Sequence, residues 1–251
     1  MGTITVYPIP SAVEAQTLSG AVAVVIDVLR ATSVLTFAVR SGVKEIIPVL
    51  NVADAKQLRQ QFPPESVLLG GERFGLPIDG FDLGNSPQHY TPEVVGGKTL
   101  IFTTTNGTAA IHAAAKGTKT IFLASFLNAA AVIERIKNEG NIVILCAGTD
   151  GQETEEDLLL AGCLTARLIR QQGLQRFYRL NETAEKVLQL WQEPAAADLI
   201  RQLRQSTGGE NLIRIGLEAD IGVAAQIDSI DVVPTAAILC EEAARTYVRF
   251  V

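Results

Sequence analysis

Short apolar runs alternate with stretches of helical periodicity over most of the first 172 residues. The runs are rich in valine, isoleucine and leucine, as is typical of strands that are buried on both faces. We expect strands at residues 22–29, 45–50, 66–71, 99–104, 120–125 and 141–147. The expected helices are residues 31–40, 53–62, 108–116, 129–138 and 155–172. Strands that alternate with helices predict an α/β fold with a mainly parallel sheet.

The chain becomes more helical after about residue 175. Helical periodicity recurs in residues 181–191, 195–205 and 209–216, and an apolar segment at residues 231–239 could return to the sheet. No low-complexity linker and no internal repeat divides the sequence. We therefore expect a single domain over residues 1–251 with a helical insertion at about 175–216; a two-lobed arrangement is the alternative.

Composition and charge narrow the class of protein. Hydrophobic residues make up 47% of the chain and charged residues 19%, which can build a large core and argues against disorder. The net charge is −6 and no basic run stands out, so we expect no nucleic-acid partner. No segment has the length of a membrane span, and three cysteines are too few for a disulfide framework. We therefore expect no membrane association and a cytoplasmic location.

The polar residues after the first apolar run are candidates for a site, because ligands of α/β folds bind beyond the carboxyl ends of the strands. Asp27 lies near the end of this run, where a buried carboxylate is costly unless it is paired or binds a metal. Arg30, Thr32 and Ser33 follow at the expected helix start, where hydroxyl and backbone N–H groups favour a phosphate. A structural Asp–Arg pair with a helix cap is the alternative interpretation.

Further candidates follow the strand expected at residues 66–71. Glu72 can bind a hard cation, and Arg73 can hold a phosphate or a carboxylate through two parallel hydrogen bonds; a surface Glu–Arg pair is the alternative. Residues 80–87, which include Asn85 and Ser86, are dense in turn residues. They form either a tight turn or part of a long functional loop.

Residues 103–108 join a strand to a helix and carry four hydroxyl groups, an amide and a glycine. Such a segment is typical of an anion site at a helix N-terminus. A helix cap would explain only one or two of these groups. The candidates here are Thr104, Thr105, Asn106, Gly107 and Thr108.

Cys146 ends the last strand, and Glu156 and Asp157 lie at the acidic start of the long helix. Acidic residues there complement the helix dipole, or one or two of them bind Mg²⁺. Two familiar motifs are absent: Pro92 stands where a P-loop needs its first glycine, and Gln152 stands where a cysteine-based phosphatase needs arginine. The residues alone indicate an α/β enzyme with an anion site and Mg²⁺, and they name no reaction.

Taken together, these segments resemble the 2-phosphosulfolactate phosphatase family. The resemblance covers nearly the whole chain and rests on an ordered set of motifs, at residues 25–33, 70–73, 80–87, 103–108, 146–148 and 156–157. It implies a three-layer α/β/α fold and a Mg²⁺-dependent hydrolase that converts (2R)-phospho-3-sulfolactate to 3-sulfolactate and phosphate. In some organisms this step belongs to coenzyme M biosynthesis. The partner would be a small anionic phosphate ester.

Residue chemistry on these motifs gives a set of expected roles. Asp27, Glu72 and Asp157 would hold Mg²⁺, with Glu156 in reserve. Arg30 would neutralise the transferring phosphoryl group, and Arg73 would hold the sulfonate or the carboxylate. The other anion-binding candidates are Thr32, Ser33, Asn85, Ser86, Thr104, Thr105, Asn106, Gly107, Thr108 and Cys146. The nucleophile is either a water activated by the metal or a carboxylate such as Asp27.

Two other functions stay open at this point. One is a phosphatase of another small acidic ester, and the other is a phosphate- or sulfonate-binding protein without catalysis. Several carboxylates weigh against the second, because an anion binder gains nothing from negative charge unless a metal is present. We expect a homodimer, because two-fold dimers are the commonest assembly.

Overall fold

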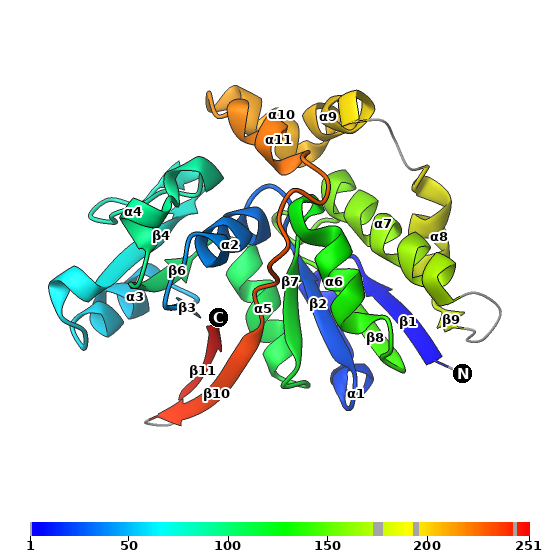
Figure 1. Ribbon diagram of the computed structural model, residues 1–251, viewed down its shortest axis with the longest axis horizontal. Helices are drawn as coiled ribbons and strands as arrows, with labels where there is room; N and C mark the ends of the chain where they lie inside the picture. Colours follow the sequence, from blue (N-terminus) through cyan, green and yellow to red (C-terminus); the bar gives the residue numbers. More distant parts are fainter. Residues whose placement is uncertain (1, 173–177, 193–195, 243–244) are drawn as a thin grey trace.

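The first of two sheets is wholly parallel (Figure 1). The structure, a computed structural model, describes residues 2–172, 178–192, 196–242 and 245–251. The order of the five strands is β7 (Ile121–Ala124), β2 (Val22–Ile26), β8 (Asn141–Cys146), β1 (Gly2–Tyr7) and β9 (Tyr178–Leu180). All four pairs run in the same direction, as the alternation of strands and helices predicts.

The second sheet is mixed. The order of its six strands is β10 (Ala236–Glu242), β11 (Arg245–Phe250), β3 (Glu45–Pro48), β6 (Thr99–Thr103), β4 (Val67–Arg73) and β5 (Leu76–Pro77). Strand β6 pairs in parallel with β3 and β4, and the pairs toward both edges are antiparallel. The sequence pattern predicts the individual strands and does not separate them into two sheets.

Helices cover both faces of the first sheet, which gives the predicted α/β/α layers (Figure 1). Two helices, α2 (Ala31–Arg40) and α5 (Gly107–Ala115), lie between the two sheets. The outer face of the first sheet carries α6 (Ala129–Ile136), α7 (Glu155–Gln172) and α8 (Glu182–Leu190). The outer face of the second sheet carries α3 (Val52–Arg59).

The burial of β2 explains its continuous apolar sequence. Val24 and Ile26 pack into the core under the outer helices, and Ala23 and Val25 pack into the core that contains α2 and α5. Because successive side chains of a strand point to opposite faces, a strand covered on both sides needs an apolar residue at every position.

Three helices follow α8 and lie together at the top of Figure 1: α9 (Ala196–Gln205), α10 (Thr207–Arg214) and α11 (Ala219–Ala224). Of the helical region expected at residues 175–216, the structure describes α8, α9 and α10, whereas Tyr178–Leu180 form β9 of the first sheet instead of a helix. Residues 175–177 and 193–195 lie outside the described residues. The sequence pattern also did not predict β1, β5, β11 and α11. The short elements are α1 (Ala15–Leu18), α4 (Pro92–Val95), η1 (Pro10–Ala12), η2 (Pro64–Ser66), η3 (Pro87–His89) and η4 (Phe126–Asn128).

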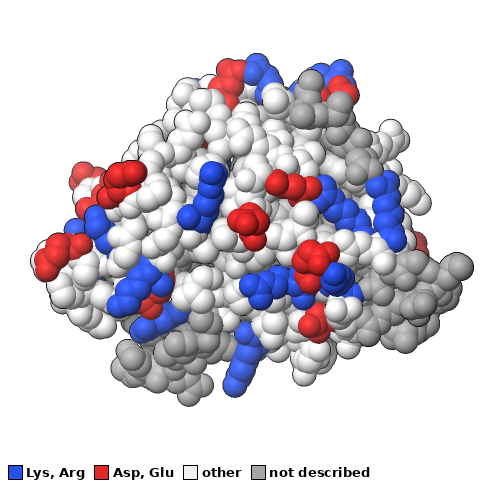
Figure 2. Space-filling model, viewed as in Figure 1, with Lys and Arg blue, Asp and Glu red and all other residues white. Residues whose placement is uncertain are grey.

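The surface offers no single concentration of charge on the face seen in Figure 2. There, acidic and basic side chains are interspersed, with wide uncharged areas between them over the described part of the chain. Among the described helices, none is both long and apolar enough to cross a membrane.

Candidate active site

A pocket of about 200 Å³ opens where strand ends of both sheets meet α10. The first sheet contributes Asp27, which directly follows β2, and the second contributes Glu72 near the end of β4. Glu156 and Asp157 come from the first turn of α7. The pocket therefore lies beyond the carboxyl ends of parallel strands, where ligands of α/β folds are expected.

The buried charges of the molecule gather at this pocket. Six charged side chains are buried among the described residues: Asp27, Arg30, Glu72, Glu156, Asp157 and Asp220. The first five line the pocket, and Asp220, which lies outside the lining, accepts a hydrogen bond from Arg30. Five carboxyl groups thus surround one guanidinium group. A buried charge is costly unless a partner compensates it, so this excess of carboxyl groups needs a cation or protons.

Asp27 is fixed by the first turn of α2. Its Oδ1 accepts a hydrogen bond of 3.0 Å from the backbone N–H of Ala31, and its backbone N–H donates to Thr32 Oγ1 over 3.1 Å. Gly107 lies against the other carboxylate oxygen, since a Cβ at Gly107 would come within 2.5 Å of Asp27 Oδ2. Burial, together with nearby Glu72 and Glu156, raises the pKa of Asp27 to about 7.

Asp157 connects the loops that follow β2 and β8. Its Oδ1 accepts from the backbone N–H of Val28 over 2.9 Å, and its Oδ2 accepts from that of Gly148 over 3.1 Å. Burial and the nearby Asp27 and Glu156 raise the pKa of Asp157 well above its usual range. The backbone thus positions a carboxyl group that its surroundings otherwise disfavour as an ion.

Glu156 meets the N-terminus of α10. Its Oε2 accepts a 3.4 Å hydrogen bond from the backbone N–H of Gly208, and burial raises the pKa of Glu156. A Cβ at Gly208 would lie only 2.2 Å from Glu156 Oε1, so the close approach of helix and carboxyl group requires glycine. The neighbouring Glu155 accepts from Thr207 N–H over 3.0 Å and binds the two helices together.

Glu72 is held by backbone groups on two sides. Its Oε2 accepts from the N–H of Gly75 over 2.7 Å, within its own hairpin. Its Oε1 accepts from the N–H of Thr105 over 2.6 Å, and the Thr105 hydroxyl donates to Oε2 over 3.1 Å. Glu72 therefore ties the β4–β5 hairpin to the loop after β6, two segments that line the same pocket.

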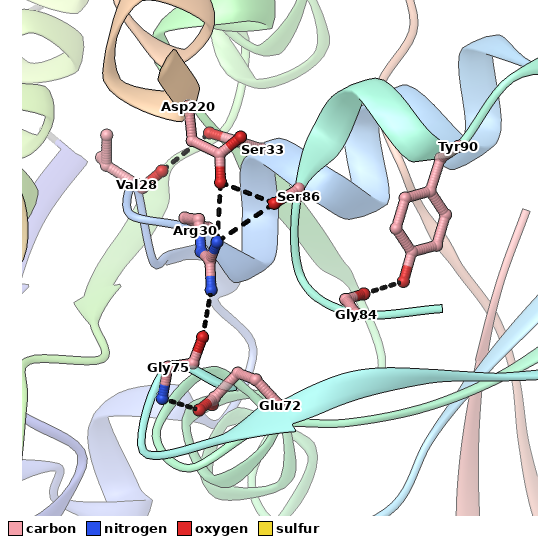
Figure 3. A network of polar contacts seen from close by, with 9 residues as sticks. All are labelled: Val28, Arg30, Ser33, Glu72, Gly75, Gly84, Ser86, Tyr90 and Asp220. Carbon is pink, nitrogen blue, oxygen red and sulfur yellow. Dashed lines mark hydrogen bonds and ion pairs between the residues drawn. The ribbon is translucent and has the colours of Figure 1, made fainter. Parts of the chain in front are cut away.

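Arg30 is the centre of the polar network drawn in Figure 3. Its Nη1 donates to Asp220 Oδ2 over 2.6 Å and to Ser86 Oγ over 3.3 Å, and its Nη2 donates to Gly75 O over 2.8 Å. Ser86 also donates to Asp220 Oδ2 over 2.8 Å. Residues from α11, the hairpin and the turn before η3 thus fix the guanidinium group.

The structure places several predicted residues outside the pocket lining. The guanidinium of Arg73 donates to Glu72 O, Leu50 O and Thr103 Oγ1, which directs it along the second sheet. Five further residues predicted for the site are buried, and the hydroxyl groups among them form hydrogen bonds with backbone atoms: Thr32, Ser33, Thr104, Thr108 and Cys146. Burial, and the nearby Asp157, also raise the pKa of the Cys146 thiol well above its usual range. Their observed contacts stabilise the loops, and none of them lines the pocket.

Other predicted residues do come together. Asn85, Thr105 and Asn106 line the pocket beside Arg30 and the carboxyl groups. Ser86 and Gly107 do not line it, but Ser86 accepts a hydrogen bond from Arg30 and Gly107 packs against Asp27. The Oδ1 atom of Asn85 is buried and has no hydrogen-bond partner, which marks it as an acceptor for a bound molecule.

Sequence reasoning missed the helical side of the pocket. Gly208, Asn211 and Arg214 of α10 line it, and Asp220 of α11 supports Arg30. The only sequence signal was the pair of glycines at 208 and 209, placed beside polar residues at the start of a helical stretch. Nothing in the periodicity of that stretch indicates which strand ends it faces.

Comparison with known proteins assigns the chain to a family. Residues 7–237 match the sequence model of the family described as 2-phosphosulpholactate phosphatase. The chain belongs to this family. A relative from Caldanaerobacter subterraneus subsp. tengcongensis, named "Probable 2-phosphosulfolactate phosphatase", is 40% identical over 212 residues, which cover 84% of this chain and 86% of the relative. A relative of the same name from Symbiobacterium thermophilum is 39% identical over 223 residues, 88% of this chain and 93% of the relative.

The match to the 2-phosphosulfolactate phosphatase family confirms the resemblance seen in the sequence motifs. It includes every residue that lines the pocket and also α11 with Asp220. The helical part of the chain, α9 to α11, which carried the fewest sequence signals, therefore lies within the region matched by the family model, and α10 forms one wall of the site.

The donor set of the pocket suits a hard divalent cation. Asp27, Glu72, Glu156 and Asp157 offer carboxylate oxygens, the ligands that Mg²⁺ prefers, and Mg²⁺ needs only one or two of them beside water and substrate oxygens. As the described side chains stand, no three His, Cys, Asp or Glu residues form a ready-made cage. Burial raises the pKa values of Asp27, Glu156 and Asp157, and a bound cation would stabilise the ionised forms of these groups.

Proposed function

We propose that this protein is a phosphoric monoester hydrolase that converts 2-phosphosulfolactate to sulfolactate and phosphate, and that it requires Mg²⁺. The observation that carries the proposal is the pocket in which five of the six buried charges of the described residues meet, in a chain of this family. A small pocket with carboxyl groups, an arginine and an unpartnered amide suits a small anionic ester rather than a polymer.

Asp27 and Asp157 are the first candidates to hold Mg²⁺, because both are fixed by backbone N–H groups at the ends of the first sheet. Glu72 and Glu156 would complete the oxygen environment from the other walls. When bound, the cation supplies charge neutralisation to the phosphoryl oxygens and to the leaving oxygen.

Arg30 supplies the fixed positive charge of the proposed reaction. Hydrolysis joins a water oxygen to phosphorus and breaks the bond between phosphorus and the ester oxygen, which then takes up a proton. Negative charge spreads over the phosphoryl oxygens as this happens, and a guanidinium already held in place stabilises it without reorganisation. The contacts to Asp220, Ser86 and Gly75 hold Arg30 in this way.

Other residues would position the substrate and restrict water. The buried Oδ1 of Asn85 can accept a hydrogen bond from the attacking water or from the product hydroxyl. Leu29, Leu212 and Ile215 give the pocket an apolar wall. Such a wall lowers the local dielectric and strengthens the charge interactions inside the pocket.

The test is phosphate release from 2-phosphosulfolactate, 2-phospholactate and phosphoglycolate, each measured with Mg²⁺ and with EDTA. Mg²⁺-dependent turnover that prefers the sulfonated ester supports the proposal. Equal turnover of the three esters would keep the phosphatase and discard the named substrate. Binding of the anions without phosphate release from any ester would favour a binding protein without catalysis.

We also propose that the enzyme works in the cytoplasm as a homodimer. Cys146 is a buried thiol outside any disulfide, which is consistent with a reducing compartment. The dimer rests on the prevalence of two-fold assemblies. Light scattering during gel filtration would test it, and a monomer at micromolar concentration would contradict it.

A further inference from the structure

The pocket contains a second arginine that the proposed hydrolysis does not yet use. Among the described residues, Arg30 and Arg214 are the basic side chains that line the pocket. Arg30 already has a carboxylate partner, Asp220. Arg214 is exposed, and the contact recorded for it is with a neutral group: its Nη2 donates to Asn211 Oδ1 over 2.6 Å. Among the described residues, Arg214 is therefore the pocket cation that has no carboxylate partner, whereas Arg30 has one.

The direction of α10 separates Arg214 from Glu156. The helix begins at the acidic end, where Gly208 contacts Glu156. It reaches the β4–β5 hairpin at its other end, where a Cβ at Gly75 would lie 2.8 Å from Ile215 Cδ1. With a rise of 1.5 Å per residue, Arg214 lies about 9 Å farther along the helix axis than Gly208. A ligand with two separated anionic groups can therefore bind at both ends.

On the basis of the proposed function, we infer that Arg214, oriented by Asn211, binds the sulfonate group of the substrate and determines its specificity. In phosphosulfolactate the sulfur is one bond farther from the ester carbon than the carboxylate carbon is, so the sulfonate reaches farthest from a phosphate held at the carboxyl groups. A guanidinium group matches the oxygens of such an anion with parallel donors.

This inference moves the sulfonate contact from Arg73 to Arg214. The Nη atoms of Arg73 are bonded to Glu72 O, Leu50 O and Thr103 Oγ1, and Arg73 does not line the pocket. Arg214 lines it and keeps N–H groups beyond its single bond to Asn211.

The experiment compares wild type with Arg214→Gln, Arg214→Lys and Arg135→Gln. Arg135 is exposed on α6, away from the pocket lining, so its replacement removes the same charge from the molecule and serves as the control. The readout is the kcat/KM for 2-phosphosulfolactate divided by that for 2-phospholactate, which lacks only the sulfonate. We expect Arg214→Gln to lower this ratio by at least about tenfold, mainly through KM, and Arg214→Lys to lower it less. The ratio for Arg135→Gln should equal that of wild type.

A second measurement keeps the inference independent of turnover. Calorimetry should show that Arg214→Gln weakens the binding of sulfolactate by at least about tenfold and that of lactate by less. An unchanged ratio in Arg214→Gln, or an equal loss for both ligands, would overturn the sulfonate assignment while the proposed function stands. If wild type releases no phosphate from either ester, the proposed function fails, and sulfolactate binding still decides the role of Arg214.

Discussion

Asp220 and Arg30 form a buried ion pair that joins two parts of the chain 190 residues apart. Both side chains are nearly inaccessible, at 6% and 3% exposed, and the two atoms lie 2.6 Å apart. The pair connects α11 to the loop that follows β2. The helical part of the chain thereby determines the orientation of the arginine proposed to act on the phosphoryl group.

Replacing Asp220 with Asn should impair both stability and activity. The variant keeps the shape of the side chain and leaves the buried guanidinium without its countercharge, which should lower the free energy of unfolding by roughly 3 kcal/mol. Because Arg30 would lose its fixed orientation, kcat should fall by about tenfold or more. Urea denaturation and phosphate-release kinetics measure the two effects.

Asp198→Asn is the matched control for this variant. Asp198 pairs with Arg201 over 2.9 Å, and both side chains are more than half exposed. Such a surface pair should contribute less than about 1 kcal/mol, and its loss should leave kcat unchanged. Equal effects of the two substitutions would show that the Asp220–Arg30 pair has no special role.

Replacing Asp27 with Asn should abolish most turnover and leave the protein folded. The amide keeps an oxygen that can accept from the Ala31 N–H, so the start of α2 should persist. The charge proposed to hold Mg²⁺ is lost, and kcat should fall by at least about a hundredfold. Circular dichroism verifies the fold and phosphate release measures the loss. Full activity in the folded variant would remove Asp27 from the site.

The sequence identified the acidic side of the pocket because its residues follow strands with strong apolar patterns. Asp27, Glu72 and Asp157 all lie at or after the carboxyl ends of such strands or at the start of the following helix. The parallel topology of the first sheet brings Asp27 and Asp157 to one edge, so the sequence pattern alone could place these two together, whereas Glu72 comes from the second sheet. The family motifs contain the same residues, and the family match spans all of them.

The second sheet and the helical wall could not be predicted in the same way. Strands β2 and β3 both read as buried apolar runs, although β2 belongs to the first sheet and β3 to the second. Periodicity reports that a face is buried and does not report what covers it. Asp220 illustrates the consequence, because its role depends on a contact with Arg30 that no local pattern encodes.

The same limit of sequence patterns explains why Arg73 was expected to hold the sulfonate or the carboxylate of the substrate. An arginine directly after a glutamate at a strand end fits a pocket as well as a sheet edge. Its orientation depends on Leu50 O and Thr103 Oγ1, which come from neighbouring segments of the second sheet. Only the three-dimensional arrangement shows that Arg73 braces the sheet while Arg214, far along the chain, faces the pocket.

Without metal, the protein should lose stability as the pH rises from about 4 to 7. The pKa of Asp27 is about 7 in the folded protein against an ordinary value of 3.8. Between these values the folded state keeps a proton that the unfolded state has lost, so deprotonation on raising the pH costs folding free energy. Unfolding measured in EDTA at several pH values should show the decline, and Asp27→Asn should reduce it. Stability that rises over this range, with no difference from Asp27→Asn, would contradict the burial of an ionisable Asp27.

Mg²⁺ should restore this stability, and more strongly at pH 8 than at pH 5. The cation binds the ionised carboxylates, which are abundant only at the higher pH, and it compensates their mutual repulsion. At a concentration a hundred times its dissociation constant, Mg²⁺ should add about 2.7 kcal/mol to the free energy of unfolding. Thermal unfolding with MgCl₂ or EDTA at both pH values measures the shift. A shift of equal size in Asp27→Asn and wild type would show that the ion binds elsewhere.

Gly107→Ala should damage the site through one added methyl group. A Cβ at this position would lie 2.5 Å from Asp27 Oδ2 and 2.6 Å from the Cβ of Ala31. One of these groups must move, so we expect kcat to fall by about tenfold or more and the free energy of unfolding to fall by about 1–3 kcal/mol. Gly222→Ala in α11 is the control, since a Cβ there meets nothing within 4 Å. That control should keep full activity and gain up to about 1 kcal/mol, because alanine favours helix over glycine. Equal activity of the two variants would mean that Asp27 tolerates displacement and is not held in a fixed position for the reaction.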